Sequence, residues 1–224
     1  MNIGALKQTV EQDGFAVVPK CLDEATVQRL SQEFDDNLYP QRNLLAVPSV
    51  RLLAKSVSVR EIMEVVLGAH FFAVRGIFFN KTRSSNWKVL WHQDLTIAVR
   101  ERLDVGGFTA WTMKSGVFHV QPPAHVMNNI LAVRLHLDES GIENGPLRVI
   151  PGTHKECRLS KEHIVNLQKR DAVTCAVPRD GALLMRPLLL HASSGCAVPK
   201  SRRVSHLEFA TSELPGGLHW HEQV

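Results

Sequence analysis

The pattern of apolar runs and turn residues from residue 70 onward limits the fold more than any other feature of this chain. Short apolar or alternating runs there are separated by Gly, Pro and Asn, a pattern typical of an antiparallel barrel or sandwich. The runs predict strands near residues 70–80, 87–95, 129–137, 147–151, 173–177, 181–186, 187–192 and 202–210. Because a jelly roll needs eight strands, we expect a mainly β (α+β) fold with a jelly-roll core.

A short strand and a first helix are predicted near the N-terminus. The strand is expected over residues 14–19. Asp23 is expected to cap the helix, which ends before Pro40. Apolar residues recur within it at helical spacing: Val27, Leu30, Phe34 and Leu38.

A second helix is predicted before the strands begin. Ser58 and Glu61 form a capping box at its start, and Gly68 ends it. Its apolar face consists of Val59, Ile62, Met63 and Val66. We expect both helices to pack on one sheet of the jelly roll.

The length and composition predict a single domain. The 224 residues are 44% hydrophobic, enough to bury one sizeable core and too few to promise two. We expect a helical part over residues 1–69 and the jelly-roll core over residues 70–224. The segment 96–128 is long and rich in Gly, Pro and aromatic residues. Such insertions usually serve as lids or binding loops, so we predict an inserted lid or substrate loop.

Charge and cysteine usage narrow the functional class. The formal net charge is +4, but the basic residues are scattered, so the sequence does not indicate nucleic-acid binding. The basicity is weak evidence for an anionic small substrate or cosubstrate. The first twenty residues lack the apolar run of a signal peptide or membrane span, which predicts a soluble protein. The four cysteines form no Cys-x-x-Cys pair, so we expect reduced thiols and a cytoplasmic location. The oligomeric state stays open.

The sequence contains two His-x-Asp motifs that could begin a metal site. An Fe(II) site that activates O₂ needs two imidazoles and one carboxylate on one face. A His-x-Asp on a strand provides two of these ligands, because residues i and i+2 point to the same side. Chance alone gives roughly 0.4 such motifs in a chain of this composition, so the pattern alone identifies nothing. The candidates, with two similar His-x-Glu motifs, are His92-Gln-Asp94, His136-Leu-Asp138, His154-Lys-Glu156 and His206-Leu-Glu208.

Strand order separates the two His-x-Asp motifs. In a jelly roll of this type the pair ends the second core strand and the remaining histidine lies on the seventh, so four strands intervene. Four predicted strands separate Asp94 from His191, whereas only three separate Asp138 from His191. We therefore expect His92, Asp94 and His191 to be the metal ligands. The alternatives are a surface histidine at His92 and an ordinary core histidine at His191. The ligand face is expected to alternate with a packing face made of Trp87, Val89 and Trp91.

An arginine follows the last proposed ligand at the start of the next strand. A guanidinium there can bind the distal carboxylate of 2-oxoglutarate in a bidentate pair. Arg202 and Arg203 are both candidates. On strand alternation, Arg203 shares a face with Leu207 and Phe209, whereas Arg202 shares one with His206 and Glu208. Arg202 is therefore the expected site-facing residue, and an exposed strand-edge charge is the alternative.

Together these motifs resemble the phytanoyl-CoA dioxygenase family. The resemblance covers nearly the whole chain, through Asp13-Gly-Phe-Ala-Val-Val-Pro19, Trp91-His-Gln-Asp94, Glu143-Asn-Gly-Pro-Leu-Arg-Val-Ile-Pro-Gly-Thr-His154 and the run from His191-Ala-Ser-Ser to Arg202. It implies a double-stranded β-helix core that uses Fe(II), 2-oxoglutarate as cosubstrate and O₂. The implied metal ligands, which are also the catalytic residues, match His92, Asp94 and His191. The implied 2-oxoglutarate contacts match Arg202 and Ser193.

The resemblance also bears on the reaction. Halogenating relatives lack the carboxylate ligand, so the presence of Asp94 favours hydroxylation. The implied activity is hydroxylation of an unactivated carbon of a small-molecule substrate, with release of succinate and CO₂. The family name does not assign phytanoyl-CoA as the substrate, because family members act on varied compounds.

Several further residues are assigned by their position. Arg134 and His136 share the inward polar face of one strand and resemble a family position near the cosubstrate, with a structural salt bridge as the alternative. Lys81 and Lys88 precede the ligand pair and could meet a carboxylate, and Lys81 is the predicted cosubstrate contact. His154 is expected to fix a turn. The predicted substrate contacts in the insertion are Trp111, His119 and Gln121.

Two other functional classes compete with the oxygenase. A catalytically silent jelly roll could hold a small acid, and the absence of metal affinity would favour it. A cupin-like metalloenzyme could use two histidines and a carboxylate without 2-oxoglutarate. Cupins usually gather more histidine in the first motif and do not need an arginine eleven residues after the last ligand.

Overall fold

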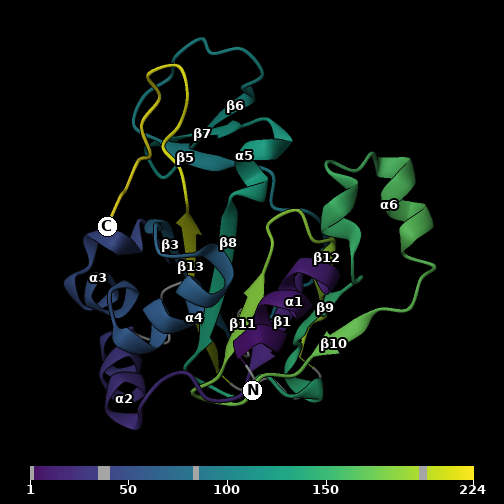
Figure 1. Cartoon of the computed structure of the whole chain (residues 1–224). Coiled ribbons are helices and arrows are strands. Elements are labelled where there is room, and N and C mark those ends of the chain that lie inside the picture. Colours follow the sequence, from purple (N-terminus) through teal and green to yellow (C-terminus); the bar gives the residue numbers. More distant parts are fainter. Residues whose placement is uncertain (1–2, 35–40, 83–85, 197–200) are drawn as a thin grey trace.

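The computed structural model describes residues 3–34, 41–82, 86–196 and 201–224, and it contains two facing antiparallel sheets (Figure 1). The large sheet has six strands, in the order β1 (Phe15–Val18), β11 (Ala182–Met185), β8 (Ile130–His136), β13 (Arg202–Ala210), β3 (Phe72–Lys81) and β2 (Gln41–Arg42). The small sheet has four, in the order β10 (Val173–Cys175), β9 (Leu147–Val149), β12 (His191–Ser193) and β4 (Val89–His92).

The strand order confirms the predicted jelly roll. Each predicted run overlaps one observed strand, and the chain crosses from one sheet to the other at every step between these strands except from β9 to β10, which pair in the small sheet. Four strands of the two facing sheets, β8 to β11, lie between β4 and β12 in the sequence, as predicted, and the other strands between them, β5 to β7, form a separate sheet. The run predicted over 187–192 is the least accurate, because β12 begins only at His191 and a turn precedes it.

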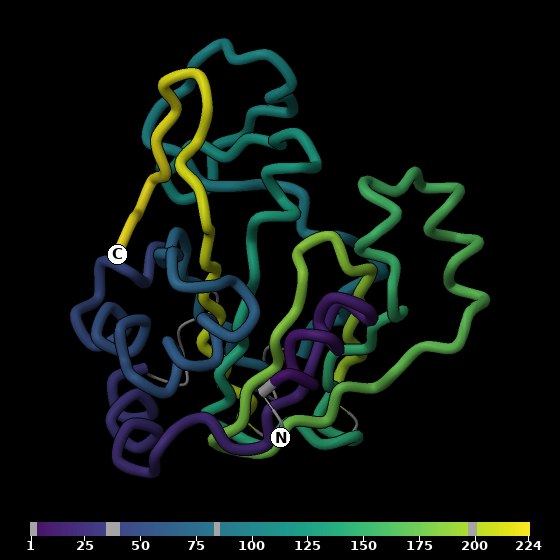
Figure 2. The backbone as a smooth tube through the Cα atoms, in the orientation of Figure 1, coloured from purple at the N-terminus to yellow at the C-terminus, as the bar shows by residue number. Residues whose placement is uncertain are grey.

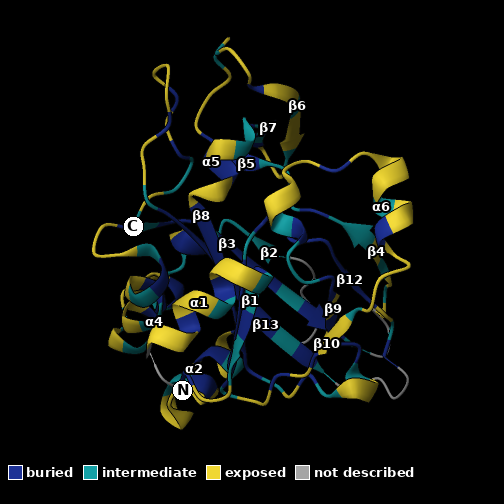
Figure 3. Cartoon of the chain, turned by 45° about the vertical axis from the view of Figure 1, so that its right-hand side comes forward, coloured by how far each residue is buried: buried dark blue, intermediate teal, exposed yellow. Residues whose placement is uncertain are grey.

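Helices cover the outer face of the large sheet. They are α1 (Ile3–Asp13), α2 (Glu24–Glu33), α3 (Pro48–Ala54) and α4 (Val57–Leu67). Their buried residues form one apolar cluster with the outward side chains of the large sheet, as the pattern of buried and exposed residues shows (Figure 3). This packing is the predicted one. Short 3₁₀ turns lie at Leu44–Ala46, Ile142–Asn144 and Thr153–Glu156.

The helix boundaries agree with the sequence at one end of each predicted helix. The Asp23 carboxylate caps α2 by accepting from the Thr26 backbone N–H at 2.6 Å. Gly68 ends α4 with a φ of +82°. The capping box at Ser58 is wrong: α4 begins at Val57 with Ser56 as its N-cap, because only two residues separate it from α3 and the second helix must start early. Leu38 and Pro40 lie outside the described residues.

The segment 96–128 is a folded substructure and not an irregular loop. It contains β5 (Ile97–Val99), β6 (Thr109–Lys114), β7 (Val117–Gln121) and α5 (Ala124–Asn128), and the sheet order is β5-β7-β6. Ser115 and Gly116 join β6 to β7 with positive φ at both positions, the geometry of a tight hairpin turn. The C-terminal segment runs beside this sheet (Figure 2), where His221 donates to the Ala98 carbonyl at 3.1 Å.

Three smaller features complete the description. The four cysteines are free. Within the described part of the chain, no helix combines the length and the apolar character needed to cross a membrane. Helix α6 (Lys161–Leu167) covers the outer side of the small sheet through a cluster of Ile150, Leu159, Leu167 and Leu190.

Candidate metal centre

The space between the two sheets is apolar at one end and polar at the other. Apolar residues that include Ala132, Val149 and Met185 fill the first end. The polar end contains a cavity of about 100 Å³. Its lining is Arg75, Ile77, Phe79, Trp87, Val89, His92, Asp94, Arg134, Leu147, His191, Ser193, Arg202 and His206. A larger surface hollow of about 850 Å³ beside Asp138 and Glu143 has no histidine in its lining.

Strands β4 and β12 bring the two histidines together. His191 pairs directly with His92, and Ser193 pairs with Val89, so three residue steps on β4 oppose two on β12. The extra residue is a β-bulge, which resets the alternation of side chains. Val89 and His92 therefore both line the cavity, and the predicted strict alternation of a packing face through Val89 with a ligand face is wrong.

Hydrogen bonds fix the tautomer of both imidazoles. His92 donates from Nδ1 to the Leu90 carbonyl at 2.8 Å, and His191 donates from Nδ1 to the Leu189 carbonyl at 2.8 Å. A carbonyl can only accept, so the proton must lie on Nδ1 in each ring. Each Nε2 is left with a free lone pair, the state in which histidine binds a metal.

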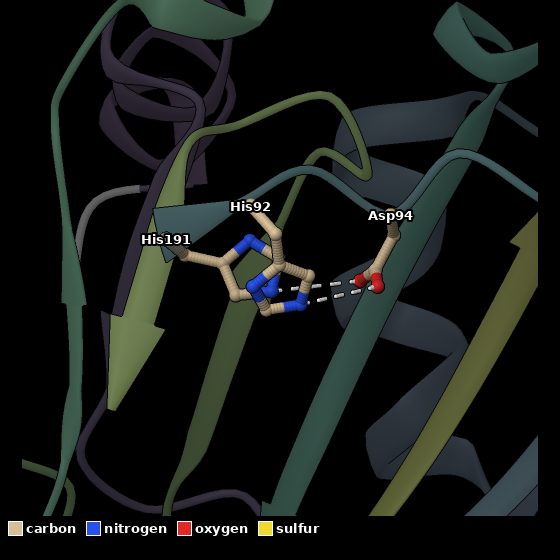
Figure 4. Close-up of side chains that lie close together, drawn as sticks. All are labelled: His92, Asp94 and His191. Carbon is tan, nitrogen blue, oxygen red and sulfur yellow. Dashed lines mark ion pairs between the residues drawn. The ribbon is translucent and has the colours of Figure 1, made fainter. Parts of the chain in front are cut away.

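Both Nε2 atoms point at the Asp94 carboxylate (Figure 4). Nε2 of His92 lies 3.9 Å from Oδ1 of Asp94, and Nε2 of His191 lies 3.8 Å from Oδ2 of Asp94. The three candidate ligand atoms lie within 4.8 Å of one another, and no other such group occurs in the part of the chain that the structure describes. Two imidazoles and one carboxylate form the facial donor set that suits non-haem Fe(II). The residues present therefore fit iron.

Electrostatics keep His191 and Asp94 in their ligand forms. Burial lowers the pKa of His191 to about 4, despite the attraction of Asp94, so the imidazole is neutral at neutral pH. Burial tends to raise the pKa of Asp94, but the neighbouring imidazoles, His191 foremost, lower it to about 2. A neutral imidazole and an ionised carboxylate are the protonation states that metal binding needs.

The residue between the two β4 ligands ties the site to the rest of the barrel. Gln93 is buried and donates from Nε2 to the carbonyls of Cys157 at 2.8 Å and Leu188 at 2.6 Å. Its Oε1 accepts from the Leu159 backbone N–H at 2.8 Å. Leu188 lies three residues before His191, so one amide side chain connects the segments that carry all three ligands.

We predict that Gln93→Leu weakens metal binding as well as the fold. The substitution leaves one buried N–H and two carbonyls without this partner, which should lower the free energy of unfolding by about 2 kcal/mol. Loss of a group that orients ligands should lower the metal affinity by ~10-fold or more. Chemical denaturation and Mn(II) titration measure the two effects. Gln32→Leu, an exposed glutamine on α2, is the control, and equal Mn(II) affinity in both variants would contradict the prediction.

A second group of polar residues gathers at one end of the cavity. Arg202 is buried and donates to the Gly145 carbonyl. Lys81 is fully buried beside it and donates from Nζ to Ser193 Oγ at 3.1 Å and to the Ser194 carbonyl at 2.6 Å. Arg134 lies with its guanidinium 5.0 Å from the centre of the Phe79 ring. The structure thus places Arg202, Ser193 and Arg134 on the cavity and Lys81 directly behind them.

The alternative candidates occupy other surroundings. Arg203 points away from the cavity and forms a bidentate pair with Asp138, with nitrogen–oxygen distances of 2.8 Å. Asp138 is therefore engaged elsewhere, and the second His-x-Asp motif is not part of the metal centre. His136 is buried but does not line the cavity, and burial lowers its pKa well below the usual value.

The sequence analysis missed a buried network that adjoins the site. Arg134 donates to Nδ1 of His206 at 3.3 Å, and Nε2 of His206 donates to Glu208 at 3.2 Å. Glu208 also accepts from Arg75, whose other terminal nitrogen donates to the Thr96 carbonyl at 2.9 Å. The available signal was the two-residue spacing on β3, which puts Arg75 on the same face of the strand as Ile77, Phe79 and Lys81.

The predicted substrate contacts do not line the cavity. Trp111 lies under the Arg102 guanidinium, 5.6 Å from it, and packs on the apolar cluster of the insertion. His119 is buried on β7, and Gln121 is partly exposed at the end of the same strand. Lys88 is exposed on the outside of the small sheet. His154 lies in the turn Thr153–Glu156, the position predicted for it.

We compared the sequence with family profiles and with curated proteins. The family profile described as phytanoyl-CoA dioxygenase matches residues 10–204, which confirms the predicted resemblance. No curated protein matches the sequence significantly.

Several solved structures share the fold. The non-heme alpha ketoglutarate dependent epimerase SnoN from nogalamycin biosynthesis is 13% identical, covers 94% of this chain and 81% of its own, and has a TM-score of 0.70. The carbocyclase SnoK from the same biosynthesis is 13% identical, with coverages of 93% and 84% and a TM-score of 0.69. HygX from Streptomyces hygroscopicus, solved with nickel and 2-oxoglutarate bound, is 16% identical, with coverages of 91% and 84% and a TM-score of 0.65. At these identities the similarity shows the fold.

Proposed function

Since this chain belongs to the phytanoyl-CoA dioxygenase family, we propose that it is an Fe(II)- and 2-oxoglutarate-dependent oxygenase that acts on a small molecule. The observation that carries the proposal is the convergence of His92, Asp94 and His191 within 4.8 Å, beside a cationic end of the same cavity. Two imidazoles and one carboxylate would hold the metal and leave adjacent positions open. When bound, iron with 2-oxoglutarate and O₂ supplies the oxidising chemistry.

The cationic end of the cavity is the proposed site for the distal carboxylate of 2-oxoglutarate. Arg202 presents a buried guanidinium there, which can form a bidentate pair with a carboxylate. The Ser193 hydroxyl accepts from Lys81, so its own proton is free to be donated to the cosubstrate. Arg134 and Lys81 add positive charge from the side and from behind. These four residues orient the cosubstrate and balance its charge.

Hydroxylation is the proposed outcome, because the carboxylate of Asp94 is present in the position that halogenating relatives leave without one. The printed activities of SnoN and SnoK, an epimerase and a carbocyclase, belong to those proteins. They show that this fold also occurs in enzymes with other reaction outcomes. The substrate positioned next to the metal therefore decides the product, and hydroxylation of an unactivated carbon is the simplest of these reactions.

The decisive experiment is anaerobic reconstitution with Fe(II), followed by addition of 2-oxoglutarate and O₂. We expect metal binding, 2-oxoglutarate binding that needs the metal, and release of succinate that a substrate stimulates. Absence of metal affinity would favour the non-catalytic binding module. Metal binding without any affinity for 2-oxoglutarate would favour a cupin-like enzyme.

The affinity for 2-oxoglutarate should fall above about pH 8. Burial, and next the charge of Arg202, lower the pKa of Lys81 to about 8. Below that pH the ammonium attracts the dianion, and above it the attraction is lost. Because one proton is linked to binding, the dissociation constant should rise by up to about tenfold per pH unit. Titration of the Mn(II)-loaded protein at several pH values measures the effect, and Lys81→Met should bind more weakly but lose this pH dependence. The same slope in Lys81→Met would contradict the assignment.

A further inference from the structure

Two charged groups, cationic Arg202 with Lys81 and the Arg75–Glu208 ion pair, lie at opposite ends of the inward face of β3 and β13. In the strand register, Arg202 on β13 lies opposite Lys81 on β3 at one end, and Glu208 lies opposite Arg75 at the other. Six residues along β3 separate Lys81 from Arg75, which corresponds to about 20 Å. His92 and Asp94 lie on the cavity between these ends, since the cavity lining includes both Arg75 and Arg202.

2-Oxoglutarate cannot occupy both ends. Its four carbon–carbon bonds of ~1.5 Å span at most about 6 Å, far less than the ~20 Å between the backbone positions of Lys81 and Arg75. If Arg202 binds its distal carboxylate, the Arg75 end is left for another molecule. Arg75 is paired with Glu208 and with the Thr96 carbonyl, while its buried Nε has no hydrogen-bond partner among the described residues.

The small inserted sheet lies directly beyond Asp94 at the Arg75 end. Only two residues separate Asp94 from β5, and the bond from Arg75 to Thr96 ties β3 to that connection. His119 on β7 pairs with Ala98 on β5 and with Thr112 on β6, so these three side chains share one face. Lys114 lies two residues after Thr112 and therefore presents its side chain on the same face.

The electrostatic interactions of Lys114 agree with this position. Burial, and next the charges of Arg42 and Arg75, lower the pKa of Lys114, while Asp94 opposes them. The side chain is half-buried, and no carboxylate of the described residues forms an ion pair with it. Arg42 is paired with Ile77, which lines the cavity, so its side chain lies on the cavity side of the large sheet.

We propose that Lys114, supported by Arg75, binds an anionic oxygen group of the organic substrate, a carboxylate or a phosphate. This inference rests on the proposed function, because it takes the Arg202 end to be filled by 2-oxoglutarate. The anionic group would lie under the β6–β7 hairpin and leave the rest of the substrate near Asp94. Three arginines and a single carboxylate line the cavity, and although Glu208 pairs with Arg75, Lys114 adds a positive charge at this end that an anionic substrate group would balance.

The test uses matched pairs of small probes. Straight-chain carboxylic acids and alkyl phosphates are compared with their primary amides and alcohols. Binding is measured by saturation-transfer NMR on the apo protein and by paramagnetic relaxation on the protein loaded with Mn(II) and 2-oxoglutarate. We expect acids or phosphates to bind and the neutral analogues not to bind. The two arms show whether a carboxylate or a phosphate is preferred.

Variants assign the effect to Lys114. Lys114→Met should weaken binding of the anionic probes about tenfold or more, and Lys114→Glu should abolish it. Both variants should keep their affinity for Mn(II) and 2-oxoglutarate. If the unmodified protein bound neither Mn(II) nor 2-oxoglutarate, that result would contradict the proposed function and not this inference. Lys55→Met, an exposed lysine at the end of α3, is the control. The inference is overturned if neutral analogues bind as well as acids, if no anionic probe binds, or if Lys114→Met matches Lys55→Met.

Discussion

The double variant His92→Ala/Asp94→Ala is expected to lose metal binding and all 2-oxoglutarate-dependent succinate release. Two of the three candidate ligands disappear, so His191 remains as a single donor. Because a residue that only orients a ligand costs 10- to 100-fold in affinity, the loss here should exceed about a hundredfold. Isothermal titration with Mn(II) and a succinate assay with anaerobically loaded Fe(II) measure the two effects.

The second His-x-Asp motif provides the control for this experiment. Asp138→Asn removes a carboxylate from the same sequence pattern, but Asp138 is paired with Arg203 and faces away from the cavity. Its metal affinity and succinate release should match those of the unmodified protein, although it should melt at a lower temperature. Turnover that survives in the His92→Ala/Asp94→Ala protein would rule out the metal centre.

Replacing Arg202 by methionine should nearly eliminate 2-oxoglutarate binding while the fold persists. The cosubstrate carboxylate would then lie in a buried site without its bidentate partner, and truncation of one partner of such a pair costs ~3 kcal/mol, about a hundredfold in affinity. Mn(II) affinity should stay unchanged, because Arg202 contributes no metal ligand. Titration of 2-oxoglutarate into the Mn(II)-loaded variant measures the loss.

Arg203→Met is the natural counterpart, since it removes the same charge from the adjacent position. The side chains of Arg203 and Asp138 are each 19% exposed, so their bidentate pair is largely shielded from solvent. Its loss should lower the free energy of unfolding by about 2 kcal/mol and leave the 2-oxoglutarate affinity intact. If Arg203→Met lost 2-oxoglutarate and Arg202→Met kept it, the assignment of the two arginines would have to be exchanged.

The contrast between these two arginines shows how much strand alternation can predict. A strand sends successive side chains to opposite faces, so the apolar partners of Arg203 and the polar partners of Arg202 were enough to orient both. The same reasoning failed around His92, because the pairing of β4 with β12 contains a bulge. A bulge depends on the partner strand, and nothing in the local sequence of β4 announces it.

The metal ligands could be predicted from the sequence, whereas the hydrogen-bond network beside them could not. Strand counting alone selected Asp94 over Asp138, because the order of strands in a jelly roll fixes which ones meet. The network of Arg75, His206 and Glu208 joins residues up to 133 positions apart, and such pairs form only when β3 and β13 lie side by side. The hairpin formed by β6 and β7 around Ser115 and Gly116 was not predicted, because the segment 96–128 was interpreted only as an inserted lid or substrate loop.

By itself, the sequence predicted the strands, the three candidate ligands and the inward arginine from local periodicity and spacing, and it indicated the family through the resemblance of its motifs. Only the tertiary structure decided which segments meet: the bulge that turns Val89 and His92 to the same side, the contacts of Gln93, and the tie from Arg75 to the connection between Asp94 and the inserted sheet. The physical reason is that hydrogen bonds and charges between distant segments depend on packing geometry, which no single stretch of the chain contains.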